Sequence, residues 1–252
     1  MVINKPFLAK LKHFDEPKSM QRYFKNAMLL VATALVTFSN NVAYAEDWAG
    51  GYVGLHAGFQ NGQVKDDYSG FIANAPWLSY IDQISIKGAV VGGLVGYNFQ
   101  NNALVYGIEG DFGLANTKGT LDFPGDGTIG AYITDVNINW NSHVRARIGL
   151  SNDKALFFVS AGLAVAQFDY GYAWPDRGLA QVYHSNGLEP GLSLGAGIEY
   201  KFNPDFQIRA EYLYDRYGVK NFVFNDTPDD YIAIDDVSFD THTFRLSVSH
   251  RF

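Results

Sequence analysis

Apolar and polar residues alternate along much of this chain with a period of two, which is the period of a β-strand. The last stretch, HTFRLSVSHRF (242–252), places Phe244, Leu246 and Val248 on one face and Arg245 on the other. Seven further stretches alternate in the same way: GYVGLHAGFQ, GAVVGGLVGYNF, LVYGIEGDFGL, VNINWNSHVRARIGL, LFFVSAGLAV, LSLGAGIEYKF and FQIRAEYLYD. The pattern predicts eight β-strands and few helices.

The spacing of these stretches indicates how the strands are connected. The short connections are QNNA (100–103), SNDK (151–154) and NPD (203–205), whereas the long ones cover roughly 61–86, 115–135, 168–189 and 217–240. Strands of about ten residues suit a tilted crossing of a bilayer, and short periplasmic turns with long outer loops are typical of bacterial outer-membrane barrels. We therefore predict an all-β fold, an eight-stranded antiparallel transmembrane β-barrel with four long outer loops.

The polar face of the predicted strands carries four acidic and four basic residues, so its charges balance. They are Glu109, Asp111, Arg145, Arg147, Glu199, Arg209, Glu211 and Arg245. A charged side chain on the lipid face near the midplane costs about 2–4 kcal/mol, so we expect these eight to point inward. The interior of an eight-stranded barrel is just wide enough to be filled by side chains. We predict a structural charge network there instead of a wide aqueous pore.

The apolar faces should then contact lipid. Val136 and Ile138, which alternate with asparagines, are assigned to the lipid face on this basis. Aromatic residues gather near both ends of the strands, as expected for belts at the two membrane interfaces. Tyr52, Phe206 and Phe252 are assigned to the periplasmic belt.

The N-terminal segment has the features of a secretory signal peptide. Lys18, Arg22 and Lys25 precede an apolar run at 27–38, and Ala43-Tyr44-Ala45 fits the small-x-small cleavage rule. The run is too short to span a bilayer. We expect a signal peptide at 1–45, with 1–19 as a possible upstream extension if Met20 is the start, and a barrel domain at 46–252.

Composition narrows the classes of partner and of stabilising bond. The chain has no cysteine, so disulfides do not stabilise the fold. Its net charge is −7, and residues 46–252 alone contain 13 basic and 24 acidic residues, a net charge of −11. This charge argues against nucleic acid as a partner.

Several motifs resemble a known family. They are DWAGGYVGLHAGFQ (47–60), VVGGLVGYNFQ (90–100), VYGIEGDFG (105–113), VRARIGL (144–150), GAGIEYKF (195–202), AEYLYD (210–215) and HTFRLSVSHRF (242–252). Together they resemble the small outer-membrane β-barrel proteins of alphaproteobacteria, the porin-family or surface-antigen proteins with a membrane domain like that of outer membrane protein A. The resemblance covers the strands and not the loops.

The resemblance implies a barrel in the cell outer membrane, in contact with lipid and lipopolysaccharide. Some members of the family are surface antigens, some affect envelope integrity and some bind haemin. The aromatic residue Phe252 looks like the family's assembly signal, which the barrel-assembly machinery reads. We expect a structural function in the envelope or a function in host interaction. The alternatives are a receptor for haem or another small ligand, and a narrow porin. Haemin and host surface molecules are therefore candidate partners.

Candidate catalytic residues are few. An acyl-transfer enzyme needs a serine, a histidine and a carboxylate close together. The serine–histidine neighbours are His184 with Ser185 and Ser142 with His143, and His242 lies near the outer end of the last strand. None has a clear set of partners in the sequence, so we predict no catalytic site and no enzyme.

Ligand sites are also conceivable in the predicted outer loops. Tyr172, Tyr183, His184 and Tyr231 are residues of the types that ligate haem iron, although ordinary packing in the loops is the simpler interpretation. The segment 217–240 holds six aspartates, and hard cations such as Ca²⁺ favour carboxylates. Its spacing is not that of an EF-hand loop, and a solvated acidic loop is the default. The sequence predicts no cofactor and no metal site.

Overall fold

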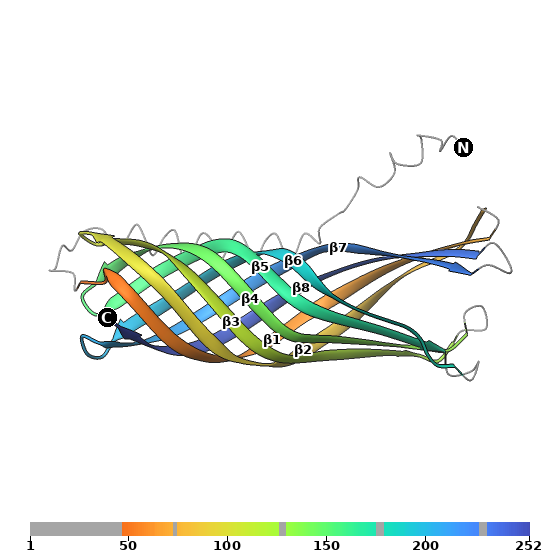
Figure 1. Cartoon of the computed structure of the whole chain (residues 1–252), viewed down its shortest axis with the longest axis horizontal. Coiled ribbons are helices and arrows are strands. Elements are labelled where there is room, and N and C mark those ends of the chain that lie inside the picture. Colours follow the sequence, from red (N-terminus) through yellow and green to blue (C-terminus); the bar gives the residue numbers. More distant parts are fainter. Residues whose placement is uncertain (1–46, 73–74, 126–129, 175–178, 227–230) are drawn as a thin grey trace. The chain divides into compact units, whose positions relative to one another are not determined.

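The computed structural model describes residues 47–72, 75–125, 130–174, 179–226 and 231–252, and the expected signal peptide lies outside them. The strands are β1 (Gly50–Ile72), β2 (Ala75–Asn101), β3 (Leu104–Phe123), β4 (Tyr132–Asn152), β5 (Ala155–Trp174), β6 (Leu179–Lys201), β7 (Phe206–Asp226) and β8 (Tyr231–Arg251). Each strand pairs antiparallel with its sequence neighbours, and β8 returns to β1 (Figure 1). The predicted eight-stranded antiparallel barrel is confirmed.

The pairing of β1 with β8 closes the barrel along the full length of both strands. Its register runs from Tyr52 opposite Arg251 to Ile72 opposite Tyr231. Just beyond the last pair, the backbone N–H of Phe252 donates to the carbonyl of Gly51 over 3.1 Å. A closed barrel satisfies the backbone groups of every strand inside the sheet, which a bilayer requires of any β-structure that crosses it.

The three short turns lie where the sequence predicted them. Between β2 and β3, Asn102 takes a positive φ of 55°, and between β4 and β5, Asp153 takes a φ of 50°. Asn and Asp adopt this left-handed conformation more easily than other residues with a side chain. In the third turn the side-chain Oδ1 of Asn203 accepts backbone N–H groups from Asp205 and Phe206.

The strands are much longer than the sequence indicated. They contain between 20 and 27 residues, and the pairing of β1 with β2 continues to Ile72 opposite Ala75. The prediction of long loops at 61–86, 115–135, 168–189 and 217–240 is therefore wrong for most of these residues. The reason is that alternation continues beyond the membrane-spanning part, with Val64, Ile84 and Ile86 facing inward and packing together.

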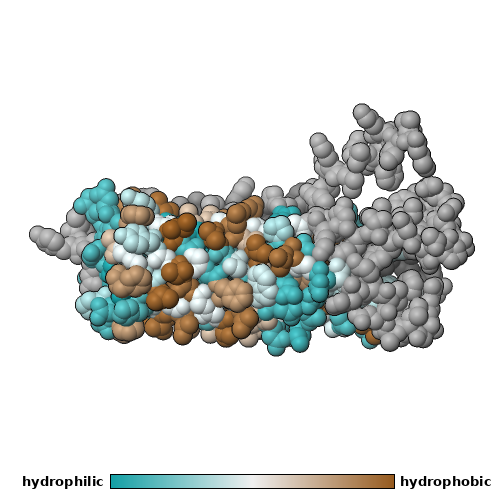
Figure 2. Space-filling model, in the orientation of Figure 1, coloured by the Kyte–Doolittle hydropathy of each residue, from teal (hydrophilic) through white to brown (hydrophobic). Residues whose placement is uncertain are grey.

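The half of the barrel nearer the three short turns is called the lower barrel here, and the other half the upper part. The outer surface of the lower barrel carries a band of apolar side chains (Figure 2). Leu55 is 74% exposed and Leu163 is 63% exposed, although both lie in well-formed strands. Such exposure is unfavourable in water, and a band about 25 Å tall with this character is the lipid-facing surface of outer-membrane barrels. Within the described residues, no helix is long and apolar enough to cross a bilayer.

Three inferred orientations are wrong. Val136 and Ile138 are fully buried inside the barrel instead of facing lipid. The register of β4 shifts at a bulge between Ile138 and Trp140. Even-numbered residues face the interior before the bulge, whereas odd-numbered residues face it after the bulge. Tyr52 also points inward, with no exposed surface, and so does not belong to the periplasmic aromatic belt.

Candidate functional site: the charged interior

The interior of the lower barrel contains all eight charged residues that the sequence analysis selected. None of them is more than 6% exposed, and β3, β4, β6, β7 and β8 supply them. Antiparallel register places opposite charges directly across from each other: Glu109 faces Arg145, Glu199 faces Arg209, and Glu211 faces Arg245. Opposite charges at such cross-strand positions stabilise a sheet.

Arg145 is at the centre of the network. Its Nη2 lies 2.8 Å from Glu109 and 2.9 Å from Asp111, and its Nη1 lies 2.9 Å from Glu211. Arg245 contacts Glu211 at 2.8 Å and Asp111 at 3.1 Å, so the two arginines share two carboxylates. A buried guanidinium is tolerated only when its donors are paired in this way, because its desolvation is otherwise very costly.

A second layer lies closer to the periplasmic end. Glu199 accepts a hydrogen bond from Arg147 over 2.8 Å, and Nε of Arg209 lies 2.6 Å from it as an ion pair. Arg209 also contacts Glu109 at 2.6 Å, which joins the two layers. The hydroxyl of Tyr52 accepts a hydrogen bond from Arg147 and donates one to Glu109, each over 2.8 Å. The network is therefore continuous across the barrel.

The position of Tyr52 depends on a glycine on the neighbouring strand. Gly96 lies directly opposite Tyr52, and a Cβ at Gly96 would lie 2.3 Å from the phenol oxygen. No side chain is compatible with that distance, so the glycine leaves free the space that the Tyr52 ring occupies.

Sequence analysis missed a second set of interior charges. His143 lies between two carboxylates, with Nδ1 at 2.7 Å from Asp111 and Nε2 at 3.3 Å from Asp215. Lys201, also buried, lies near the periplasmic end. Asp215 and Lys201 were on the predicted polar face and could have been added to the eight charged residues selected there. Their charges are opposite, so the balance of acidic and basic residues would not have changed.

An aromatic residue that precedes β1 is buried at the periplasmic end of the interior. Trp48 is fully buried, packs with Val105 and Leu156, and lies beneath the ammonium of Lys201 at 4.4 Å from the ring centroid. Its backbone N–H donates to the side-chain oxygen of Gln100. These contacts hold Trp48 across the floor of the barrel.

Above the charges the interior becomes neutral and then apolar. Gln60 donates to Thr241 and Thr243 and accepts from Thr117. Farther out, Phe168 stacks on Phe239 with centroids 4.5 Å apart, within a buried cluster of twelve residues. Buried side chains thus line the described interior at successive levels, from Trp48 to the outer apolar cluster.

Beyond the apolar cluster, two aspartates lie opposite each other in the extension of the barrel. Asp66 pairs in register with Asp82, and their carboxylates accept hydrogen bonds from Tyr170 and Tyr132 respectively, each over 2.6 Å. Burial is the main cause that raises the pKa of Asp66 to about 6, and the negative charge of Asp82 acts in the same direction. The Tyr170 hydrogen bond opposes both effects.

Among the described side chains, the candidate pair Ser142 and His143 does not have the geometry of a hydrolase site. Ser142 donates to the backbone carbonyl of Asp111, whereas the adjacent His143 points to the opposite side of the strand and contacts carboxylates. His242 is on the outer surface, with Nδ1 at 2.5 Å from the hydroxyl of Tyr212. The side chain of His184 lies outside the described residues, and that of Ser185 is half-buried.

The candidate ligand residues give a similar result. Tyr172 stacks on Tyr132 with centroids 5.3 Å apart, and the side chains of Tyr183 and Tyr231 lie outside the described residues. Among the side chains that are described, no group of three or more histidines, aspartates or glutamates has the geometry of a metal site. Most of the acidic segment 217–240 is β-strand, although several of its side chains are outside the described set.

A closed antiparallel barrel with an apolar outer band and a charged interior defines an outer-membrane β-barrel protein. The family model for the outer membrane protein beta-barrel domain matches residues 29–252, so the chain belongs to this family. Its location is therefore the outer membrane of a Gram-negative cell.

Similar proteins come from alphaproteobacteria. A 31 kDa outer-membrane immunogenic protein of Brucella melitensis is 30% identical over 209 residues, which cover 81% of this chain and 84% of that protein. A 25 kDa outer-membrane immunogenic protein of the same organism is 28% identical, over 84% of this chain and 82% of the relative. The crystal structure of OprG from Pseudomonas aeruginosa has the same fold, with a TM-score of 0.54 and 13% identity over 81% of this chain and 96% of that one.

Proposed function

We propose that this protein is a closed structural barrel that stabilises the outer membrane and presents a rigid surface outside it. The observation that supports the proposal is the presence of buried side chains at every described level of the interior. Trp48 lies across the periplasmic end, Arg145 and its carboxylates fill the middle, and the Phe168–Phe239 stack lies above them. A path for ions would have to displace buried ion pairs, at a cost of several kcal/mol for each charge left unpaired.

The extension of the strands supports the second half of the proposal. Because β1 and β2 pair as far as Ile72 and Ala75, the part of the chain outside the membrane is built largely of paired strands. Such a surface is stiffer than an irregular loop, and a stiff surface loses less entropy when a partner binds. The names of the Brucella relatives describe them as immunogenic, which is consistent with exposure at the cell surface.

Two measurements test the proposal. In planar bilayers the purified barrel should give no stable single-channel steps under conditions in which a trimeric porin, reconstituted in parallel, conducts. Deletion of the gene should make cells more sensitive to detergent with EDTA, and a plasmid copy should restore resistance. Stable steps from the wild-type barrel would favour a narrow porin instead, and a deletion strain as resistant as its parent would exclude the envelope function.

A further inference from the structure

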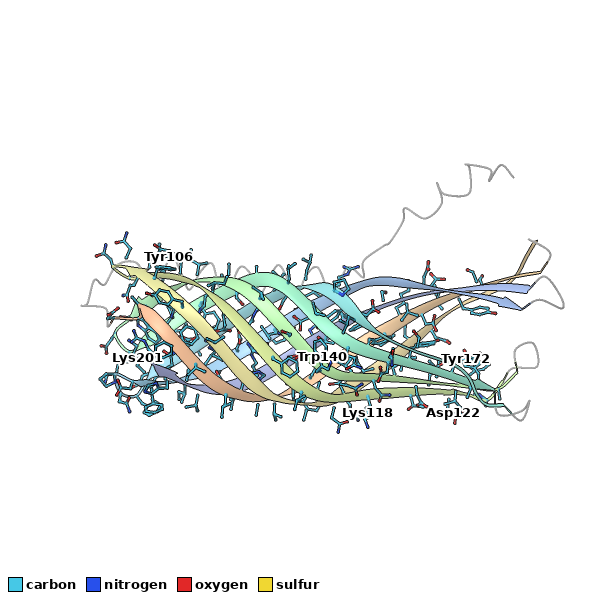
Figure 3. The ribbon with its side chains drawn as sticks, viewed as in Figure 1. Tyr106, Lys118, Asp122, Trp140, Tyr172 and Lys201 are labelled. Carbon is cyan, nitrogen blue, oxygen red and sulfur yellow. The ribbon has the colours of Figure 1, made fainter. Side chains whose placement is uncertain are left out.

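Two lysines lie directly opposite each other on the outside of the barrel. Lys87 of β2 and Lys118 of β3 are register partners, both are exposed, and both strands turn these positions away from the interior. Figure 3 shows Lys118 pointing out from the barrel wall, farther from the periplasmic turns than Trp140. Like charges at directly opposed positions destabilise a sheet, so the pair is unfavourable when nothing lies between the two ammonium groups.

The protein does not neutralise these two charges itself. Neither lysine takes part in an ion pair within the part of the chain that the structure describes. Asp135 lies on the same outer face, but its carboxylate accepts a hydrogen bond from Thr120 at 2.7 Å instead of contacting a lysine. The net charge of the domain is strongly negative, so most of its surface repels anions. Two exposed cations without a neighbouring carboxylate form a local site that attracts an anion.

The height of the pair relative to the membrane identifies the ligand. Below the lysines, the first large outward apolar side chains on these two strands are Val91 and its register partner Leu114, four residues away on each strand. At about 3.4 Å per residue and a tilt of about 40°, the ammonium groups lie roughly 10 Å above these side chains. This is the level of the headgroups in the outer leaflet, where the lipid is lipopolysaccharide.

We propose that Lys87 and Lys118 form a binding site for a phosphate group on the lipid A part of lipopolysaccharide. The phosphate would lie between the two ammonium groups and remove their repulsion, while the acyl chains would lie along the apolar surface that includes Val91, Phe112 and Leu114. Phe112 is 47% exposed and packs against Trp140, so a large apolar surface is available directly below the lysines. This inference rests on the outer-membrane location and not on the proposed envelope function.

The test uses the processed protein extracted from outer membranes into detergent. Native mass spectrometry would measure binding of bisphosphorylated lipid A to the wild type, to the double variant Lys87→Ala/Lys118→Ala, and to Lys154→Ala. Lys154 is also exposed, lies in the β4–β5 turn at the periplasmic end of the barrel, and is the matched control. Each lysine near a charged lipid surface contributes about a fivefold gain in affinity, so the double variant should bind roughly 25-fold more weakly.

Three further results are expected. Lys154→Ala should bind lipid A as tightly as the wild type does. Dephosphorylated lipid A should bind the wild type weakly, with the affinity that the double variant has for the phosphorylated lipid. Excess inorganic phosphate should not displace lipid A from the wild type. Equal binding by the double variant, or by dephosphorylated lipid, would overturn the proposal. Complete displacement by inorganic phosphate would show a site for free anions and would overturn the assignment to lipid.

A stability measurement separates a ligand site from a structural one. In detergent without lipid A, the double variant should unfold at the same temperature as the wild type or higher, because the like-charge repulsion is gone. With bisphosphorylated lipid A added, the wild type should gain more stability than the variant. A double variant that is less stable than the wild type without lipid would show that the lysines support the fold, and would count against the proposal.

Discussion

At the scale of single residues, the interior depends on a few side chains that each serve several partners. Glu109 is the clearest case, since it contacts Arg145, Arg147 and Arg209 and also accepts from Tyr52. Removing the charge of such a residue leaves several cations buried without compensation. Its contribution is therefore larger than that of a single ion pair on the surface.

The variant Glu109→Gln keeps the shape of the side chain and removes its charge. We expect it to lower the free energy of unfolding by about 3–5 kcal/mol, as for other buried pairs broken from one side. Urea unfolding in detergent micelles, followed by tryptophan fluorescence, would measure this. Asp153→Asn is the control, because this exposed turn residue has a φ of 50° that asparagine also accepts. A loss below about 1 kcal/mol would mean that the network relaxes around the neutral amide.

Asp66 gives a prediction about pH. Its pKa is raised from 3.8 to about 6, so the folded protein holds the proton more tightly than the unfolded chain does. This carboxyl therefore favours the folded state at low pH, and the advantage is lost as pH rises from about 4 through 6.

A carbon-detected NMR titration of the Asp66 carboxyl should give a midpoint near 6. Tyr170→Phe removes a hydrogen bond that stabilises the carboxylate, so it should move the midpoint upward by about one pH unit. A midpoint near 4 in the wild type would show that water reaches the carboxyl freely. A downward shift in Tyr170→Phe would contradict the assigned hydrogen bond.

Much at the residue scale could be predicted from alternation alone. The polar face of each stretch identified the eight interior charges, because lipid excludes them from the other face. The contacts could not be predicted, since the stagger of neighbouring strands decides whether Arg209 meets Glu109 as well as Glu199. Tyr52 was misplaced because an aromatic ring fits both an interface belt and a polar interior, and only its glycine neighbour on β2 distinguishes the two.

At the scale of the strands, the sequence predicted the number and the turns but not the length. Beyond the membrane, the interior changes from charged to apolar while the outer face becomes polar, as Val64 and Lys65 illustrate. The pattern is then that of a strand in water, and it was assigned to loops because charges and glycines interrupt it. The bulge at Ile138 and Trp140 reverses the phase within one strand, which no fixed period of two can represent.

The end of β8 gives a prediction about assembly. Phe252 is 79% exposed, and its ring lies against Gly51 at the edge of the sheet. Deleting it removes one backbone hydrogen bond and little buried surface, so the refolded barrel should lose no more than about 1–2 kcal/mol of stability. Insertion in cells should fall severalfold, because Phe252 is expected to act as the assembly signal.

Quantifying heat-modifiable barrel in outer-membrane fractions, beside thermal melts of the refolded protein, would separate the two effects. Phe252→Tyr is the matched control, since it keeps an aromatic ring at the same position. Equal insertion with and without Phe252 would contradict the assigned signal.

At the scale of the whole molecule, the barrel combines two environments in one continuous sheet. The lower part has lipid outside and charges inside, whereas the upper part has water outside and an apolar cluster inside. The polarity of the wall is thus inverted along its length. Composition could not show this inversion, because the two halves have opposite patterns that average out over the chain.

The closure of β1 onto β8 has a consequence for the order of the strands along the chain. The backbone N–H of Phe252 already donates a hydrogen bond to Gly51, so a short linker from residue 252 to residue 47 would join the two ends of the barrel domain. New ends could then be made by opening the chain in the turn at Asn102. Such a circularly permuted chain keeps every strand pairing of the ring. It would end at Asn101 instead of an aromatic residue. Such a chain would therefore separate the requirements for a stable closed barrel from the requirements for its assembly in the cell.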